Sequence, residues 1–286
     1  LLGIAVAGIM ITVTTLIGDY FSEEERQSFL GIQAASMSIG GLVFITAGGW
    51  LADIAWNFPF LIYGFAFITF VLSWKFLPEP DFNSGIINNQ KISLVNGLKK
   101  SPVGIIILIY FMAFAGMVFF YMMPVQLPFL LNKIDNITYS EIGYAIAAVN
   151  IGGAFFSFNY RIIKKRIRFS MIYFLACMLI GAGYLIISQS AGYYQTITGI
   201  ILAGGGVGLI MPNGNNWIIH VAPAEIRGRL VSYLTSALFL GQFLSPVISE
   251  PVIKYYDVPF AFLTASLILA LFSIFFIVFW LYRKRH

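Results

Sequence analysis

The stretch SEEERQSFLGIQAASMSIGGLVFITAGGWLADIAWNFPF, residues 22–60, decides the fold, because a looser copy of it returns at residues 223–260. Each copy has a charged turn, an apolar stretch with spaced Gly or Pro, a short interruption, and a second apolar stretch that opens at Pro-Phe. Duplicated units of this kind are typical of membrane transport proteins. A shift of 201 positions, which becomes 200 after a short polar loop, superposes these pairs: Glu24 and Glu225, Arg26 and Arg227, Gly40 and Gly241, Pro59 and Pro259, Phe60 and Phe260.

The composition indicates that the chain lies in a membrane. Of its 286 residues, 59% are hydrophobic and 10% are charged, whereas about a quarter are charged in a soluble domain. A spanning helix needs about 20 mostly apolar residues. Because the runs are too long and too uniformly apolar for barrel strands, the sequence predicts an all-α, polytopic helical bundle. The nine predicted spans are residues 1–17, 29–52, 59–76, 103–130, 142–159, 170–187, 193–212, 230–252 and 259–282.

The basic residues predict the orientation. The loops between spans alternate between the two sides of the membrane. The loops on one side carry only Lys133 and Lys254, and the loops and terminus on the other side carry all the remaining Lys and Arg residues. By the positive-inside rule the basic set is cytoplasmic, which places the carboxy terminus inside a multi-pass protein of the plasma (inner) membrane. The lipid bilayer is thus a partner, and a nucleic acid is not, because topology already accounts for the positive charge. The basic set is Arg26, Lys75, Lys91, Lys99, Lys100, Arg161, Lys164, Lys165, Arg166, Arg168, Arg227, Arg229, Arg283, Lys284 and Arg285.

The repeat also predicts the domain organisation. Three spans precede the second copy after the long polar loop, whereas one span precedes the first copy. We therefore expect a twelve-helix protein in which three further helices come before residue 1. Residues 1–77 are then the second half of an N-terminal six-helix bundle, residues 78–102 a cytoplasmic linker, and residues 103–286 a C-terminal six-helix bundle.

Two segments carry a family resemblance. Gly3-Ile4-Ala5, followed by residues 16–26 (LIGDYFSEEER), is similar to a fourth helix and its exit loop. The next span places Gly31, Gly40, Gly48 and Gly49 at the spacing of an antiporter signature, with Phe44-Ile45 where that signature has Gly-Pro. The chain resembles the major facilitator superfamily, and within it the bacterial drug-exporter (drug:proton antiporter) branches, aligned to the last nine of twelve helices.

Small residues and prolines in both copies predict where helices pack or bend. Small side chains let helix backbones approach closely, and a proline removes one backbone hydrogen bond. The alternative is plain helix packing without a role in gating. The predicted packing and gating residues are Gly31, Gly40, Gly48, Gly49, Gly241, Ser245 and Pro246. The group Gly204-Gly205-Gly206-x-Gly208 predicts close packing as well.

Charged residues at the cytoplasmic turns predict a gate. An acid there favours the amino end of the next helix, and an Arg can reach exposed carbonyl groups of the preceding one. For the basic run at residues 160–168 the alternative is that it only fixes the orientation of the protein in the membrane and contacts anionic lipid. The predicted gate residues are Glu24, Arg26, Arg161, Arg166, Arg168, Glu225, Arg227 and Arg229.

Polar side chains inside the spans predict where a substrate binds, because such groups are costly in hydrocarbon. The alternative for each is a hydrogen bond between helices. Aromatic and Met side chains would supply an adaptable apolar wall for amphipathic ligands. The predicted substrate-binding residues are Gln33, Tyr121, Gln126, Asn150, Asn213 and Gln242.

The sequence does not predict an enzyme. It has no H-E-x-x-H, G-x-S-x-G or G-x-x-x-x-G-K motif, and both histidines, His220 and His286, lie at a membrane edge. We therefore expect no catalytic residues, no cofactor and no metal. No acid lies mid-membrane in the nine spans, so a proton-coupling carboxylate is expected before residue 1, unless Glu141 or Glu250 is reached from outside.

The resemblance implies a secondary active transporter of small, amphipathic organic solutes, working by alternating access. Export by proton antiport, with protons as the coupling ion, is the leading prediction. Because Phe44-Ile45 departs from the Gly-Pro of the signature, uptake by proton or ion symport is the alternative. A non-transporting membrane receptor or sensor is a more remote alternative, which a large soluble signalling domain would favour.

Overall fold

The computed structural model describes the backbone of residues 8–9, 12–13, 16, 20, 23–76, 101–133, 137–223 and 226–285, and the side chains of all of these except 23–35, 37–38 and 283–285. Over these ranges the structure contains helices and turns and no strand, as predicted for an all-α membrane protein. The chain divides into two compact units, residues 1–90 and residues 91–286. Each unit is described by itself.

The described part of the first unit consists of one long α-helix and a second helical segment that begins as a 3-10 helix and continues as an α-helix. They are α2 (Glu23–Ile54), the 3-10 helix η1 (Phe58–Gly64) and α3 (Phe65–Phe76). Together α2 and the continuous segment η1–α3 cover the predicted spans at 29–52 and 59–76. The predicted span at 1–17 lies mostly outside the described residues.

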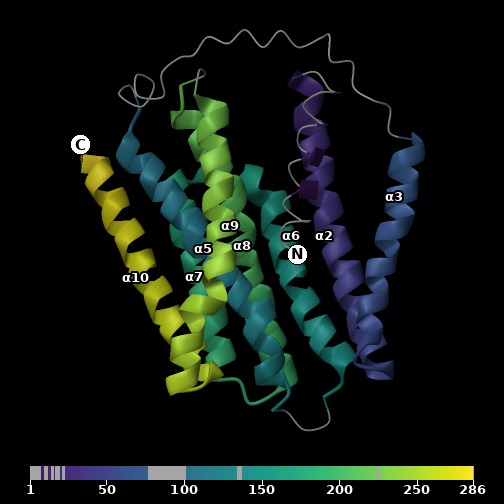
Figure 1. Ribbon diagram of the computed structural model, residues 1–286. Helices are drawn as coiled ribbons and strands as arrows, with labels where there is room; N and C mark the ends of the chain where they lie inside the picture. The colour runs from purple at the N-terminus through teal and green to yellow at the C-terminus, as the bar shows by residue number, and fades with distance from the viewer. Residues whose placement is uncertain are drawn as a thin grey trace. The chain divides into compact units, whose positions relative to one another are not determined.

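The second unit is a bundle of long helices (Figure 1). Each predicted span between residues 103 and 282 lies within one of them, and all six are long and apolar enough to cross a membrane, as is the segment Phe58–Phe76. Their connections alternate between the two ends of the bundle (Figure 1). They are α5 (Val103–Leu131), α6 (Tyr139–Arg166), α7 (Phe169–Ser188), α8 (Tyr193–Val221), α9 (Arg227–Tyr255) and α10 (Val258–Arg285).

The sequence repeat is also a repeat of helix boundaries. Helix α2 ends at Ile54 and α9 ends at Tyr255, which is the 201-residue shift found in the sequence. After each end a short turn leads to a helix with Pro in its first turn, Pro59 in η1 and Pro259 in α10. Proline suits this position because the first amide groups of a helix have no partner within it.

The two copies differ in how the second helix begins. Asp257 accepts a hydrogen bond at Oδ1 from the backbone N of Phe260 at 2.7 Å, so α10 opens as an α-helix with a side-chain cap. Asn57, before Pro59, makes no such cap, and the segment opens as a 3-10 helix. A capped first turn satisfies an otherwise unpaired amide group.

Helix α8 is the centre of the second unit. It packs on α6 and on α7, and also contacts α5 and α9, while α7 packs on α10 and α5 packs on α9. Its glycines explain these contacts. A methyl group on Gly204 would overlap the carbonyl oxygen of Val149 in α6, and one on Gly206 would overlap the carbonyl oxygen of Ala176 in α7. The close packing predicted for these glycines is confirmed.

Proline interrupts α8 without leaving its backbone unpaired. Pro212 has no N–H, so the carbonyl of Gly208, four residues earlier, lacks its helical partner. The hydroxyl of Ser157 in α6 donates to this carbonyl oxygen at 2.6 Å. A neighbouring side chain that satisfies the freed carbonyl is what allows proline inside a membrane helix.

Candidate functional site

The six predicted substrate-binding residues fall into three groups. Gln33 belongs to α2, and its side chain lies outside the described residues. Gln126 and Asn213 are buried, with 4% and 0% of their surface exposed. Tyr121, Asn150 and Gln242 are half-buried, on α5, α6 and α9 respectively. Among the five whose side chains the structure describes, no hydrogen bond joins one to another.

The buried amides take part in hydrogen bonds between helices. Gln126 Nε2 donates to Ser249 Oγ at 3.3 Å, which ties α5 to α9. Asn213 Nδ2 donates to the carbonyl oxygen of Phe169 at 3.1 Å, and its Oδ1 accepts from Tyr160 OH at 3.3 Å. These contacts match the alternative of helix cohesion for Gln126 and Asn213. Asn150 Nδ2 donates to the carbonyl oxygen of Ala147 within its own helix, at 3.3 Å.

Gln242 differs from the other amides. It lies near the middle of α9, is half-buried, and makes no hydrogen bond with any other described residue. An amide with two donors and an acceptor left open is costly in hydrocarbon, where water is absent.

Helix α9 has one face that packs on α5. A methyl group on Gly241 would overlap the carbonyl oxygen of Phe114, and Ser245 Oγ donates to the carbonyl oxygen of Val118 at 2.6 Å. Gly241 and Ser245 are fully buried at this seam, and Pro246 next to them is half-buried. Their predicted part in packing is therefore visible, while their predicted part in gating stays a prediction.

The corresponding glycines of α2 have more open surroundings within the first unit. The nearest atom to a methyl group on Gly40 is Phe44 Cδ2 at 3.9 Å, and for Gly48 it is Ile62 Cδ1 at 3.7 Å. Gly49 is buried. The surroundings of Gly31 lie outside what the structure describes.

The opposite face of α9 carries exposed hydroxyl groups that the sequence analysis did not select. Ser232, Thr235 and Ser236 are exposed on the half of α9 nearer its amino end. Each hydroxyl donates to the carbonyl four residues earlier, at 3.0, 3.1 and 3.1 Å, so each presents only acceptor lone pairs outward. Thr235 and Ser236 follow Ser232 by three and four residues in an otherwise apolar run, and this helical spacing is the signal that could have identified them. We call Ser232, Thr235, Ser236 and Gln242 the polar face of α9.

The turns α6–α7 and α8–α9 lie at the same end of the second unit (Figure 1). We call this the basic end, because Arg161, Arg166, Arg168, Arg227 and Arg229 are all exposed there. Arg227 Nη2 donates to the carbonyl oxygen of Ala222 at 3.4 Å, so an Arg of this turn reaches the end of the preceding helix, as predicted. The side chains of Glu24 and Arg26, and all of Glu225, lie outside the described residues.

A polar and aromatic cluster joins three helices near the basic end. Tyr160 of α6 bonds to Asn213, and also accepts from Asn216 Nδ2 at 3.3 Å. Lys164 Nζ lies 4.0 Å from the ring centre of Phe169, and that ring stacks on Trp217 of α8 with centres 5.3 Å apart. Cation–π and stacking contacts of this kind stabilise the turn that carries the basic run.

The described carboxylates lie at helix ends. Glu141 accepts hydrogen bonds from the backbone N of Thr138 at 2.8 Å and from its hydroxyl at 3.0 Å, in a capping box that opens α6. Asp257 caps α10, and Glu250 is exposed one turn before α9 ends. No group of three or more His, Cys, Asp or Glu that could hold a metal occurs among the residues described.

Comparison with known proteins gives the family. The model of the Major Facilitator Superfamily matches residues 1–194 and residues 125–286. The chain belongs to the Major Facilitator Superfamily. It is a multi-pass membrane protein, and the family is one of transporters rather than enzymes.

Individual relatives are similar over parts of their length. The chain is 34% identical over 113 residues to multidrug resistance protein 1 of Bacillus subtilis, an alignment that spans 39% of this chain and 28% of that protein. The inward-open xylose transporter XylE from E. coli matches 60% of this chain and 48% of its own, with 21% identity and a TM-score of 0.52. The peptide transporter POT in complex with sulfate matches 60% of this chain and 37% of its own, with 20% identity and a TM-score of 0.50. The chain thus spans less than half the length of these relatives, and the two structures show a shared fold.

Proposed function

We propose that this chain is part of a secondary active transporter that moves small, amphipathic organic solutes by alternating access. The observation that carries the proposal is the open amide of Gln242 in the middle of a membrane helix. The exposed hydroxyls of Ser232, Thr235 and Ser236 precede it on the same helix, so polar groups occur at intervals along α9 from the basic end toward the middle of the helix. Polar groups at such positions are expected where a helix lines a water-filled path.

The proposed direction is export, with protons as the coupling ion. Support comes from the partial similarity to multidrug resistance protein 1, which is 34% identical over 113 residues. Uptake by symport is the competing proposal, favoured by Phe44-Ile45 in place of the Gly-Pro of the antiporter signature. The proposed location is the plasma membrane, with the basic end and the carboxy terminus in the cytoplasm.

The polar face is proposed to contact the solute through hydrogen bonds, together with Tyr121 and Asn150. Tyr121 contributes an aromatic surface, since its ring lies edge to face with that of Phe120, with centres 5.1 Å apart. Aromatic rings next to sparse polar groups suit ligands that are partly apolar. Gln33, Gln126 and Asn213 remain proposed members of the same site. Gln126 and Asn213 would act by holding the helices that carry it.

The variants Gln242→Leu and Asn150→Leu test the proposal in the complete protein. We expect transport of at least one solute to fall about tenfold for Gln242→Leu, since losing a hydrogen bond worth about 1.4 kcal/mol changes a rate or affinity by that factor. Flux of amphipathic dyes and of polar solutes is measured in membrane vesicles, with and without an imposed pH gradient.

Gln195→Leu is the matched control, because Gln195 is exposed in the first turn of α8, where its Oε1 accepts from the backbone N of Ala191 at 3.2 Å. Unchanged flux of the whole panel in both test variants contradicts the proposed site. Solute entry into cells that depends on the pH gradient supports the symport alternative over export.

A further inference from the structure

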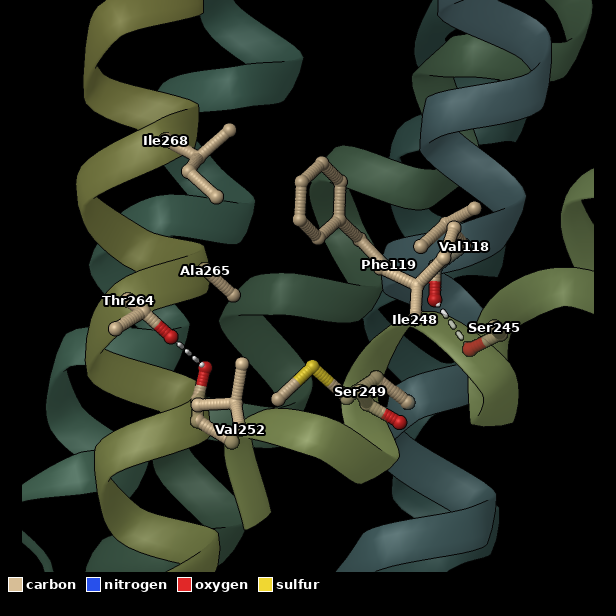
Figure 2. A pocket seen from close by; sticks show the side chains of 11 residues that line it. Val118, Phe119, Ser245, Ile248, Ser249, Val252, Thr264, Ala265 and Ile268 are labelled. Atoms are coloured by element: carbon tan, nitrogen blue, oxygen red, sulfur yellow. Dashed lines mark hydrogen bonds between the residues drawn. The ribbon is translucent and has the colours of Figure 1, made fainter. Parts of the chain in front are cut away.

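A small cavity lies between α5, α9 and α10, away from the polar face of α9. Its volume is about 70 Å³. Figure 2 shows Ala265 and Ile268 of α10 on the left, the ring of Phe119 of α5 in the middle, and Val118 of α5 with Ser245 of α9 on the right. Ile248, Ser249 and Val252 of α9 complete the lining. No residue of this cavity belongs to the polar face of α9.

The hydroxyl groups around the cavity have no hydrogen to offer a ligand. Ser245 donates to the carbonyl of Val118 at 2.6 Å (Figure 2), and Thr264 donates to the carbonyl of Ala261 at 2.9 Å. Ser249 donates to the carbonyl of Pro246 at 3.4 Å and accepts from Gln126. The remaining wall is apolar, with Phe119, Met122 and Ala265 among its members. Because an ordered water needs two to four polar partners, this wall favours an apolar occupant.

The mouth of the cavity has an exposed, apolar rim. Ile248 and Ile268 line the cavity and are still 49% and 44% exposed, so they form its rim. The other exposed side chains of α10 along the same stretch are apolar, as expected for a lipid-facing helix. They are Leu267, Leu271, Ile274, Phe275, Ile277, Val278 and Leu281.

The volume selects a thin occupant. A cavity of about 150 Å³ holds a benzene ring, and this one has roughly half that volume. The end of a linear hydrocarbon chain needs less volume than a benzene ring does, so it suits this cavity better. We propose that this cavity binds the end of an acyl chain of a bilayer lipid, inserted between α9 and α10.

Photolabelling in lipid nanodiscs tests this site. The probe is a phosphatidylcholine that carries a diazirine near the end of one acyl chain, and the labelled residues are mapped by mass spectrometry. We expect label on Met122 and Val118, which line the cavity and are only 5% and 8% exposed. Exposed Leu271 is labelled too, as an internal reference for ordinary contact with lipid.

The variant Ala265→Leu fills the cavity with three further carbon atoms. We expect it to reduce labelling of Met122 and Val118 at least fivefold relative to Leu271. Ala270→Leu is the matched control, because Ala270 is exposed on the same helix, and we expect it to leave the pattern unchanged. Thr264→Val also leaves the pattern unchanged, because an alkyl chain makes no use of the hydroxyl.

Every variant is first checked for monodisperse elution and for its unfolding temperature, and Ala261→Val replaces Ala265→Leu as the filling variant if the latter does not fold. Label confined to exposed residues overturns the proposal, as does equal labelling of Met122 with the cavity filled. A loss of labelling in Thr264→Val overturns it as well, because it would indicate a hydrogen-bonded occupant such as water. None of these outcomes depends on whether the protein transports a solute.

Discussion

At the scale of single residues, the absence of a side chain is what allows α8 to occupy the centre of the second unit. Gly204 faces α6 and Gly206 faces α7, and in each direction a neighbouring carbonyl oxygen occupies the place that a methyl group would need. Small residues at contacts between membrane helices allow close backbone packing, which is a main source of helix association in lipid. Backbone cannot move aside as a side chain can.

We therefore expect Gly204→Ala and Gly206→Ala to destabilise the bundle, by about 1–3 kcal/mol each, as is usual for overpacking a filled interior. Unfolding in detergent, followed by circular dichroism during heating, measures the loss. Gly104→Ala is the control, because a methyl group at Gly104 meets nothing within 4 Å. Equal stability of the test variants and the control contradicts the packing assigned to α8.

The hydroxyl of Ser157 is another residue with one specific contact. It compensates for the N–H that Pro212 lacks, by donating to the carbonyl of Gly208 at 2.6 Å. We expect Ser157→Ala to cost about 0.5–1.5 kcal/mol, because the carbonyl then has no partner. The free energy of unfolding in a denaturant series measures it. Ser188→Ala is the comparison, since Ser188 bonds within its own helix to Leu185 and joins no neighbour. If Ser157→Ala lowers the free energy of unfolding no more than Ser188→Ala does, the carbonyl of Gly208 has another hydrogen-bond donor.

At the scale of elements, α9 has two faces of opposite character. Gly241, Ser245 and Ser249 are buried against α5, while Ser232, Thr235 and Ser236 are exposed on the other side. Phe239, Leu240 and Phe243 are exposed as well, so the exposed hydroxyls gather in the half of α9 nearer its amino end. In a membrane, exposed hydroxyls of this kind are expected to contact water or another polar surface.

Cysteine substitution along α9 tests this division. Cys177, the one cysteine within residues 1–286, is 1% exposed, so this part of the protein contributes little background labelling. We expect Ser232→Cys, Ser236→Cys and Gln242→Cys to react with a water-soluble maleimide at least tenfold faster than Ser245→Cys and Ser249→Cys. Initial labelling rates in native membranes measure the difference. Similar rates on both faces, or no reaction at Ser236→Cys, contradict the polar face.

At the scale of the whole chain, the distribution of basic residues predicts orientation in the membrane. The turns α6–α7 and α8–α9 share one end of the second unit, and that end carries the run of Arg and Lys at residues 161–168 (Figure 1). Basic loops remain on the cytoplasmic side during insertion.

Reporter fusions measure this orientation directly. We expect a fluorescent protein fused after Arg166 or Arg229 to be active in the cytoplasm, and alkaline phosphatase to be active when fused after Lys133 or Ser190. Replacing Lys164, Lys165, Arg166 and Arg168 together with Gln should lower the fraction of correctly oriented protein. Phosphatase activity after Arg166 in the unaltered chain contradicts the predicted topology.

The helices of the second unit and the register of the repeat were predictable because they depend on local properties. The length of an apolar run must match the thickness of the bilayer, and turn chemistry at Pro59 and Pro259 marks where a helix begins. The shift of 201 residues read from Glu24 and Gly40 agrees with the ends of α2 and α9. The 3-10 opening at η1 was not predicted, because it depends on whether Asn57 caps the turn as Asp257 does.

The sequence by itself determined that the chain lies in a membrane, where its spans are and which family it resembles. Hydrophobicity, the length of the apolar runs and the motifs are properties of the chain alone. Only the tertiary structure decided which polar side chains are already paired. Gln126 and Asn213 are chemically similar to Gln242 and Asn150, yet the first two bond to neighbouring helices and Gln242 stays open. The difference arises from which helices lie side by side, because a hydrogen bond needs a partner within about 3.5 Å, and no local pattern in the sequence specifies that distance.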